Sequence, residues 1–313
     1  MKNLFIVILL LCGMSAATLN AQPQTVRTTS SAGATSENGR LAVVIGQPFF
    51  TQFTTPVGDY DFSLGVAQAQ WTRDTVYDVI TYNTPYTENG FNLPAQTETH
   101  KDSVYLVNGG IYNYDLLRTL YLIVCPHHIG DQANISYDVL AVSGHCWTKQ
   151  NLRTPKEGAM TYTSVQYPTV PGEYGLLYTW NTTLAGTAPD ADGYVQGICP
   201  AQNWHLPDAT EISDLMGNPA ESLRSLTGWV IPEVSTNTTD FTAYSAGLYN
   251  PLASRFEGLG TQTDWWTAIS MSENNAWPTS LHLPYYCDTP QLIQRNPNDA
   301  VSVRCVMKNV WPE

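Results

Sequence analysis

The sequence predicts a mainly β protein whose C-terminal part is a separate α+β domain. Apolar and polar residues alternate with a period near two over residues 72–124, which is typical of half-buried strands. Cysteine is missing from residues 22–124 and frequent afterwards, and eight of the nine tryptophans lie at or after Trp147, which indicates a domain boundary near residue 125. Residues 208–217 carry the capping signals and apolar spacing of a short helix.

Residues 1–21 have the pattern of a secretory signal peptide. Lys2 supplies the basic charge, residues 4–11 form an apolar run, and Ala21 is a small residue suited to cleavage. The run is too short to span a bilayer, and no later stretch reaches the roughly 18 consecutive apolar residues of a transmembrane helix. We therefore expect an exported protein, located at the cell surface or outside the cell, with the periplasm as the alternative.

The charge balance limits the classes of partner. The chain has 14 basic and 27 acidic residues, a formal net charge of −13, which argues against nucleic acid or an anionic membrane surface. Only 13% of the residues are charged, so neutral polar residues fill the exposed positions, as in many exported β-rich and sugar-binding proteins. The expected partner is a glycan or a surface protein.

Residues 22–71 are expected to form a small β-meander module. Gly, Pro and Asn-Gly turns separate three short predicted strands at residues 41–45, 49–53 and 62–66. The GQPFFTQ segment that starts at Gly46 resembles a module frequent in exported Bacteroidetes proteins.

Residues 72–124 are expected to form a second, β-rich module. Apolar and polar positions alternate over residues 74–77, over Pro85-Tyr86 with residues 88–91, and over residues 117–124. The pattern resembles surface repeats of the same phylum, here in a single copy, and we expect the module to be a structural spacer.

The segment from 197 to 217, GICPAQNWHLPDATEISDLMG, contains the clearest local signals. Asp208 stands at a helix N-cap, and Glu211 three residues later completes a capping box. The expected helix places Ile212, Leu215 and Met216 on one face and ends at Gly217. We expect His205 to be a hydrogen-bonded structural histidine, because no catalytic partner lies at a suggestive spacing.

Several motifs occur in order along the C-terminal part of the chain: Gly144–Trp147 with Gln150–Arg153, Tyr174–Trp180, Cys199–Pro207, Trp265-Trp266 and Val303–Val306. Taken together they resemble the Fibrobacter succinogenes major paralogous domain (FISUMP) over residues 126–308. That resemblance implies kinship with C-type lectins and with the formylglycine-generating sulfatase-modifying proteins. The expected fold class is therefore mainly β N-terminal modules plus an α+β C-type-lectin-like domain over residues 125–313.

Five cysteines remain after the signal peptide: Cys125, Cys146, Cys199, Cys287 and Cys305. In an oxidising compartment we expect two disulfides and one remaining thiol. The resemblance implies a bridge between Cys199 and Cys305. For the second bridge we expect Cys146 with Cys287, and Cys125 with Cys146 is the alternative.

We expect no catalytic residues, no metal and no other cofactor. Cys125-Pro-His-His128 and His145-Cys146 contain potential ligands, but their spacings match no standard zinc pattern. The sequence has neither a Gly-x-Ser-x-Gly nor a His-Glu-x-x-His motif, and it lacks the closely spaced cysteine pair of the sulfatase-modifying relatives. Residues 272–277 lie where a sugar-binding C-type lectin holds calcium, but they lack its proline, so calcium is only an alternative.

The predicted ligand-binding surface is the long-loop face from Trp265 to Asp288. Neighbouring residues on a strand point to opposite faces, so we expect one of Trp265 and Trp266 in the core and the other exposed. Exposed aromatic rings can stack on a sugar or anchor a protein interface. The candidate ligand-binding residues are Trp265, Trp266, Glu273, Asn275, Trp277, Tyr285 and Tyr286.

The sequence thus predicts a non-catalytic, adhesin-like binding protein. The alternative is a structural envelope or surface-appendage subunit, such as a fimbrial component, that contacts only neighbouring proteins. A diverged enzyme of the sulfatase-modifying type is the third hypothesis.

Overall fold

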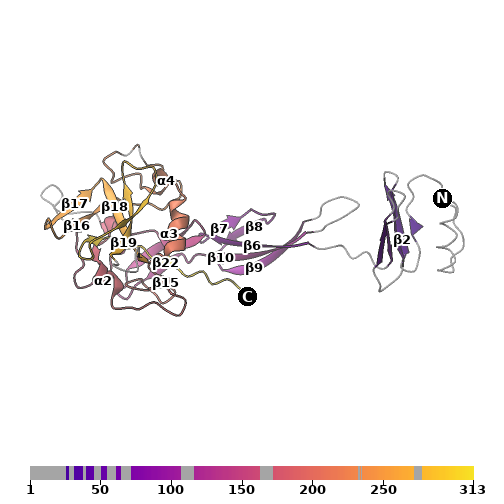
Figure 1. Ribbon diagram of the computed structural model, residues 1–313, viewed down its shortest axis with the longest axis horizontal. Helices are drawn as coiled ribbons and strands as arrows, with labels where there is room; N and C mark the ends of the chain where they lie inside the picture. Colours follow the sequence, from indigo (N-terminus) through magenta and orange to yellow (C-terminus); the bar gives the residue numbers. More distant parts are fainter. Residues whose placement is uncertain are drawn as a thin grey trace. The chain divides into compact units, whose positions relative to one another are not determined.

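The computed structural model describes residues 73–106, 116–162, 172–231, 233, 235–270 and 277–313, together with the backbone of the strands before residue 73. The chain divides into two compact units (Figure 1). One comprises Met1–Thr72 and Tyr105–Leu117, and the other comprises Arg73–Val104 and Arg118–Glu313. The boundary predicted near residue 125 lies inside the second unit.

The first unit contains one sheet with the strand order β1-β2-β3-β5-β4. Its strands are β1 (Val26–Arg27), β2 (Ala32–Glu37), β3 (Arg40–Ile45), β4 (Thr51–Thr54) and β5 (Asp61–Leu64). β3 and β5 are parallel, and β4 pairs with β5 from the outer edge. The three predicted strands correspond to β3, β4 and β5, but their order departs from a meander, because the alternation of residues does not specify which strands pair.

The second unit begins with a three-stranded sheet in which β10 (Leu116–Val124) lies between β6 (Thr72–Ile80) and β9 (His100–Leu106) (Figure 1). β7 (Thr84–Tyr86) and β8 (Leu93–Gln96) form a separate hairpin. Side chains from β7 and β10 share an apolar cluster that includes Tyr86, Leu120 and Leu122. The predicted period of two is visible in β9, where exposed and partly buried residues alternate along the strand.

Two further sheets follow. The first has the order β11 (His128–Gly130), β12 (Ser136–Val142), β13 (His145–Thr148), β22 (Val306–Met307) and β15 (Trp204–His205). The second has the order β14 (Tyr178–Thr179), β21 (Ala300–Val301), β16 (Ala246–Asn250), β18 (Gln262–Ser270), β19 (Pro278–Pro284) and β20 (Gln291–Gln294), with β17 (Arg255–Leu259) paired to β16. Because β21 and β22 enter different sheets, the last residues of the chain join both.

The helical segments are short: η1 (Gly172–Tyr174), α2 (Trp180–Leu184), α3 (Ala209–Met216) and α4 (Ala220–Leu223). α3 confirms the predicted helix and its capping box. The Asp208 side chain accepts from the Glu211 N–H, and Glu211 Oε2 accepts from the Asp208 N–H, both at 2.9 Å. Ile212 and Leu215 are buried, so the predicted apolar face packs into the core.

Both disulfides lie in the main apolar cluster. The bridge between Cys199 and Cys305 is confirmed. The expected bridge between Cys146 and Cys287 is wrong, because Cys146 pairs with Cys125, whose Cα lies 5.5 Å away. Cys287 lies in the loop after β19 as a free thiol, and its Sγ accepts from Gln291 Nε2 at 3.3 Å.

Candidate functional site

Trp265 and Trp266 are both buried, with exposed fractions of 2% and 0%. They do point to opposite faces of β18, because Trp265 packs in one apolar cluster and Trp266 in another. Both faces of the strand are covered, so the expectation that one ring faces solvent is wrong. The indole N–H groups are also engaged: Trp265 Nε1 donates to Asn151 Oδ1 and Trp266 Nε1 to the Tyr178 carbonyl.

Among the remaining predicted ligand residues, Trp277 and Tyr285 lie at opposite ends of β19. Trp277 precedes β19 and Tyr285 follows it, so a seven-residue strand separates them. At about 3.3 Å per residue, their backbones are roughly 25 Å apart. Trp277 and Tyr286 are exposed, at 49% and 69%, and Tyr285 is half-buried. Glu273 and Asn275 lie outside the described residues.

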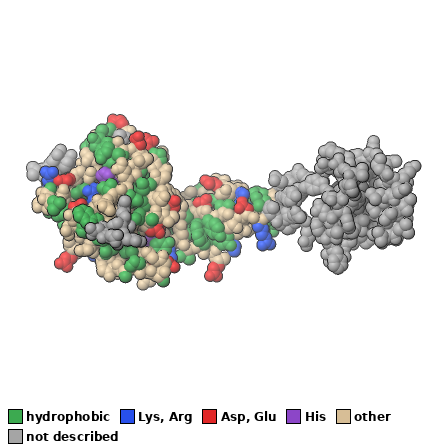
Figure 2. Space-filling model, in the orientation of Figure 1, with side chains coloured by type: hydrophobic (Ala, Val, Ile, Leu, Met, Phe, Trp, Pro, Cys, Tyr) green, Lys and Arg blue, Asp and Glu red, His purple; other side chains and the backbone are tan. Residues whose placement is uncertain are grey.

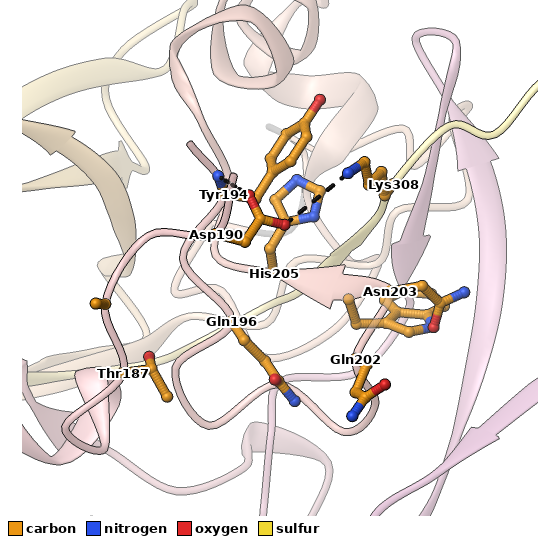
Figure 3. A pocket seen from close by; sticks show the side chains of 10 residues that line it. Thr187, Asp190, Tyr194, Gln196, Gln202, Asn203, His205 and Lys308 are labelled. Atoms are coloured by element: carbon orange, nitrogen blue, oxygen red, sulfur yellow. Dashed lines mark hydrogen bonds and ion pairs between the residues drawn. The ribbon is translucent and has the colours of Figure 1, made fainter. Parts of the chain in front are cut away.

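A pocket of about 310 Å³ opens beside β15, away from these predicted residues in the sequence (Figure 3). Its polar lining consists of Thr187, Asp190, Tyr194, Gln196, Gln202, Asn203, His205 and Lys308. Figure 3 shows Asp190, Tyr194, His205 and Lys308 gathered together and Gln202 and Asn203 on another side. No local sequence pattern indicates this site, because Lys308 is more than 100 residues from the other lining residues.

His205 joins the pocket to helix α3. Its Nε2 lies 2.8 Å from Glu211 Oε1, and both side chains are almost fully buried. The other Glu211 oxygen caps the helix, so one carboxylate holds both the histidine and the helix start. The Tyr194 ring packs against the imidazole with centroids 4.2 Å apart. His205 is therefore hydrogen-bonded and buried, as predicted.

Asp190 organises the loop at the rim of the pocket. Asp190 Oδ1 accepts from the N–H groups of Tyr194 and Asp192, each at 2.9 Å, which is an Asx-type turn. The Tyr194 hydrogen bond, with smaller effects from Asp192 and Lys308, lowers the pKa of Asp190. The carboxylate is therefore ionised at neutral pH.

Lys308 is the cation of the pocket lining. Its Nζ hydrogen-bonds to Asp192 Oδ2 and lies 3.9 Å from Asp190 Oδ2. The hydrogen bond to Asp192 raises the pKa of Lys308. The ammonium also lies over the Tyr194 ring, 5.1 Å from its centroid. Lys308 is thus already neutralised by two carboxylates.

Three amide side chains, those of Gln196, Gln202 and Asn203, belong to the uncharged part of the lining. Gln196 Nε2 makes a long hydrogen bond of 3.4 Å to the Cys199 carbonyl. Gln202 and Asn203 are exposed, and their side chains make no hydrogen bond within the described part of the chain. Each amide can donate and accept in one plane, so these groups are available to a polar ligand.

The described residues contain no group of three His, Cys, Asp or Glu side chains placed to hold a metal ion. The cysteines of the two clusters singled out in the sequence are joined in a disulfide, so they offer no thiolate. His128 instead pairs with Asp138, with Nδ1 and Oδ1 2.7 Å apart.

No curated protein and no solved structure matches the chain. Among the helices that can be described, none has the length and apolar character needed to cross a membrane. The model of the Fibrobacter succinogenes major domain matches residues 140–307, which is more than half of the chain and includes most of the pocket. The protein therefore belongs to the Fibrobacter succinogenes major domain family.

Proposed function

We propose that this protein is an exported, non-catalytic binding protein whose C-terminal domain has a C-type-lectin-like fold and holds a ligand in the pocket beside β15. One observation carries the proposal: the charged groups of the pocket are paired within the protein, whereas the amide groups of Gln202 and Asn203 are open. Such a lining suits recognition, because polar groups at fixed positions orient a ligand.

The engagement of the ionisable side chains supports a non-catalytic role. A general acid or base must exchange a proton with its substrate, and a nucleophile needs an adjacent base. Here Glu211 is shared between His205 and a helix cap, and Asp190 is held by backbone N–H groups. These contacts position the surrounding loops.

Export is supported by the two disulfides, which persist in oxidising compartments. The mixture of side chains on the surface also supports export. On the face drawn in Figure 2, charged side chains are scattered among neutral polar and hydrophobic ones. We place the protein at the cell surface or outside the cell.

The test is binding of the purified protein to arrays of glycans and of extracellular proteins, with and without a chelator. We expect a saturable ligand whose binding falls at least tenfold in Tyr194→Ala and is unchanged by chelation. Asn298→Ala, an exposed amide elsewhere in the domain, is the control. Loss of binding in Trp277→Ala instead would move the site to the loop before β19, and loss on chelation would favour calcium. Turnover of a ligand, or no ligand, would refute the proposal.

A second function, a structural subunit that binds neighbouring proteins, is favoured by exposed apolar side chains on loops of the C-terminal domain. Leu226, Val230, Ile231 and Tyr286 are 40–69% exposed. The Val230 N–H donates to the Gly260 carbonyl and the Tyr285 N–H to that of Thr261, so these loops are adjacent. Apolar groups gathered in this way mark protein interaction sites. Cross-linking in intact envelopes that is lost in Val230→Asp would support this role.

A further inference from the structure

We propose that the pocket beside β15 takes a neutral, polyhydroxylated ligand, a carbohydrate unit of one or two sugars, without a metal ion. This inference rests on the proposed binding function and names the ligand class of the same site. It follows from the hydrogen-bonding groups, the charge, the aromatic ring and the size of the pocket.

The hydrogen-bonding groups match hydroxyls. A sugar hydroxyl both donates and accepts, and neighbouring hydroxyls present these functions side by side. The side-chain amides of Gln202 and Asn203 offer an N–H donor and a carbonyl acceptor each, and both are open. They are also adjacent in the chain, so one segment can engage two neighbouring hydroxyls.

The charge around the pocket opposes an anionic ligand. Lys308 is paired with Asp190 and Asp192, which leaves one negative charge in excess at the rim. Burial raises the pKa of the Tyr194 phenol, and the negative charges of Glu211 and Asp208 raise it further. A carboxylate or phosphate would meet these charges without a free cation to pair with. A neutral ligand avoids that repulsion.

Tyr194 gives the pocket an aromatic surface. The Tyr194 ring packs against the His205 imidazole and lies under the Lys308 ammonium, and the residue remains half-buried. A ring held in this way adds apolar contact area at low entropy cost, which suits the C–H groups of a sugar. A volume of about 310 Å³ is at the small end for ligand pockets, so the ligand is short.

The experiment is calorimetric titration of the full protein with the α- and β-methyl glycosides of glucose, galactose, mannose and N-acetylglucosamine, and with the matching uronic acids. We expect saturable binding of at least one neutral glycoside, no effect of EDTA, and at least tenfold weaker binding of its uronic acid. The double variant Gln202→Ala/Asn203→Ala is expected to weaken binding at least tenfold, because two hydrogen bonds are lost.

The control double variant is Gln294→Ala/Asn298→Ala, which removes two exposed amides elsewhere and is expected to bind as the wild type does. Equal thermal unfolding of both double variants shows that the fold is intact. Uronic acids that bind as tightly as the neutral glycosides would overturn the inference. So would a protein that binds no glycoside but captures an array ligand through the pocket, in which case the proposed function stands. Binding of neither would overturn both.

Discussion

Asn151 is a buried side chain that joins distant segments of the chain through hydrogen bonds. Its Oδ1 accepts from Trp265 Nε1 at 2.8 Å and from Arg304 Nε at 2.9 Å. Arg304 is itself buried and donates to the carbonyls of Phe241 and Thr242. Burial lowers the pKa of Arg304 to about 9, so the guanidinium remains charged at neutral pH and depends on these oxygen atoms.

Asn151→Ala is expected to lower the free energy of unfolding by about 3 kcal/mol, because two buried donors lose their acceptor. Chemical denaturation measures the change. Asn181→Ala, an exposed amide on α2, is the control and is expected to change stability by less than about 0.5 kcal/mol. Equal effects of the two substitutions would contradict the role assigned to Asn151.

The surroundings of Asp264 indicate how the free energy of unfolding depends on pH. Burial by itself would raise the pKa of this carboxyl, but the His282 hydrogen bond and the Arg295 charge together hold it below the usual 3.8. Near that pH the unfolded chain binds a proton that the native state does not. The contribution of Asp264 is therefore present above about pH 4 and is lost as the pH falls further.

Urea unfolding between pH 3 and pH 7 tests this dependence. Asp264→Asn is expected to destabilise the protein at both ends of this range, and by less at pH 3 than at pH 7. The control Asp240→Asn removes an exposed carboxylate that pairs with Lys149 and is expected to have little effect at either pH. A constant loss in Asp264→Asn across the range would show that its charge is unimportant.

At the scale of elements, helix α3 and the pocket depend on the same side chain. Glu211→Ala removes the capping-box acceptor and the partner of His205 together. We expect a loss of about 2–3 kcal/mol in the free energy of unfolding, the sum of a cap and a buried charge-assisted hydrogen bond. Thr210→Ala, exposed on the same helix, is the control. A loss below about 1 kcal/mol would contradict the shared role.

Helix α3 was predictable because its signals are local: the cap and the apolar face lie within ten residues. The burial of both Trp265 and Trp266 could not be predicted, because alternation assigns two residues to opposite faces of a strand without showing that both faces are covered. Trp277 and Tyr285 are close in sequence, but Pro278–Pro284 forms an extended strand that separates them.

At the scale of the molecule, the bridge between Cys199 and Cys305 spans 106 residues and ties β22 to the segment before β15. In the chain-entropy description a loop of that length contributes about 5 kcal/mol, against about 3 kcal/mol for the 21-residue span between Cys125 and Cys146. Replacement of each pair by serine is expected to lower stability in that order. Unfolding of both double variants in urea tests it, and the reverse order would contradict this topology.

The pocket could not be predicted from local sequence, because it forms only when the folded chain brings Lys308 next to Asn203. The Lys308 N–H donates to the Asn203 carbonyl at 2.8 Å, a contact across about a third of the chain. The motifs were sufficient to identify the family, since the family model matches residues 140–307. They carry no information about the ligand.

Hydrogen–deuterium exchange of the full protein, with and without the glycoside that binds most tightly, tests the location of the binding site most directly. Exchange is expected to slow in peptides that cover residues 187–206 and Lys308, and to stay unchanged over residues 277–292. Protection confined to residues 277–292 would contradict a binding site beside β15 and would place the ligand at the loops around β19.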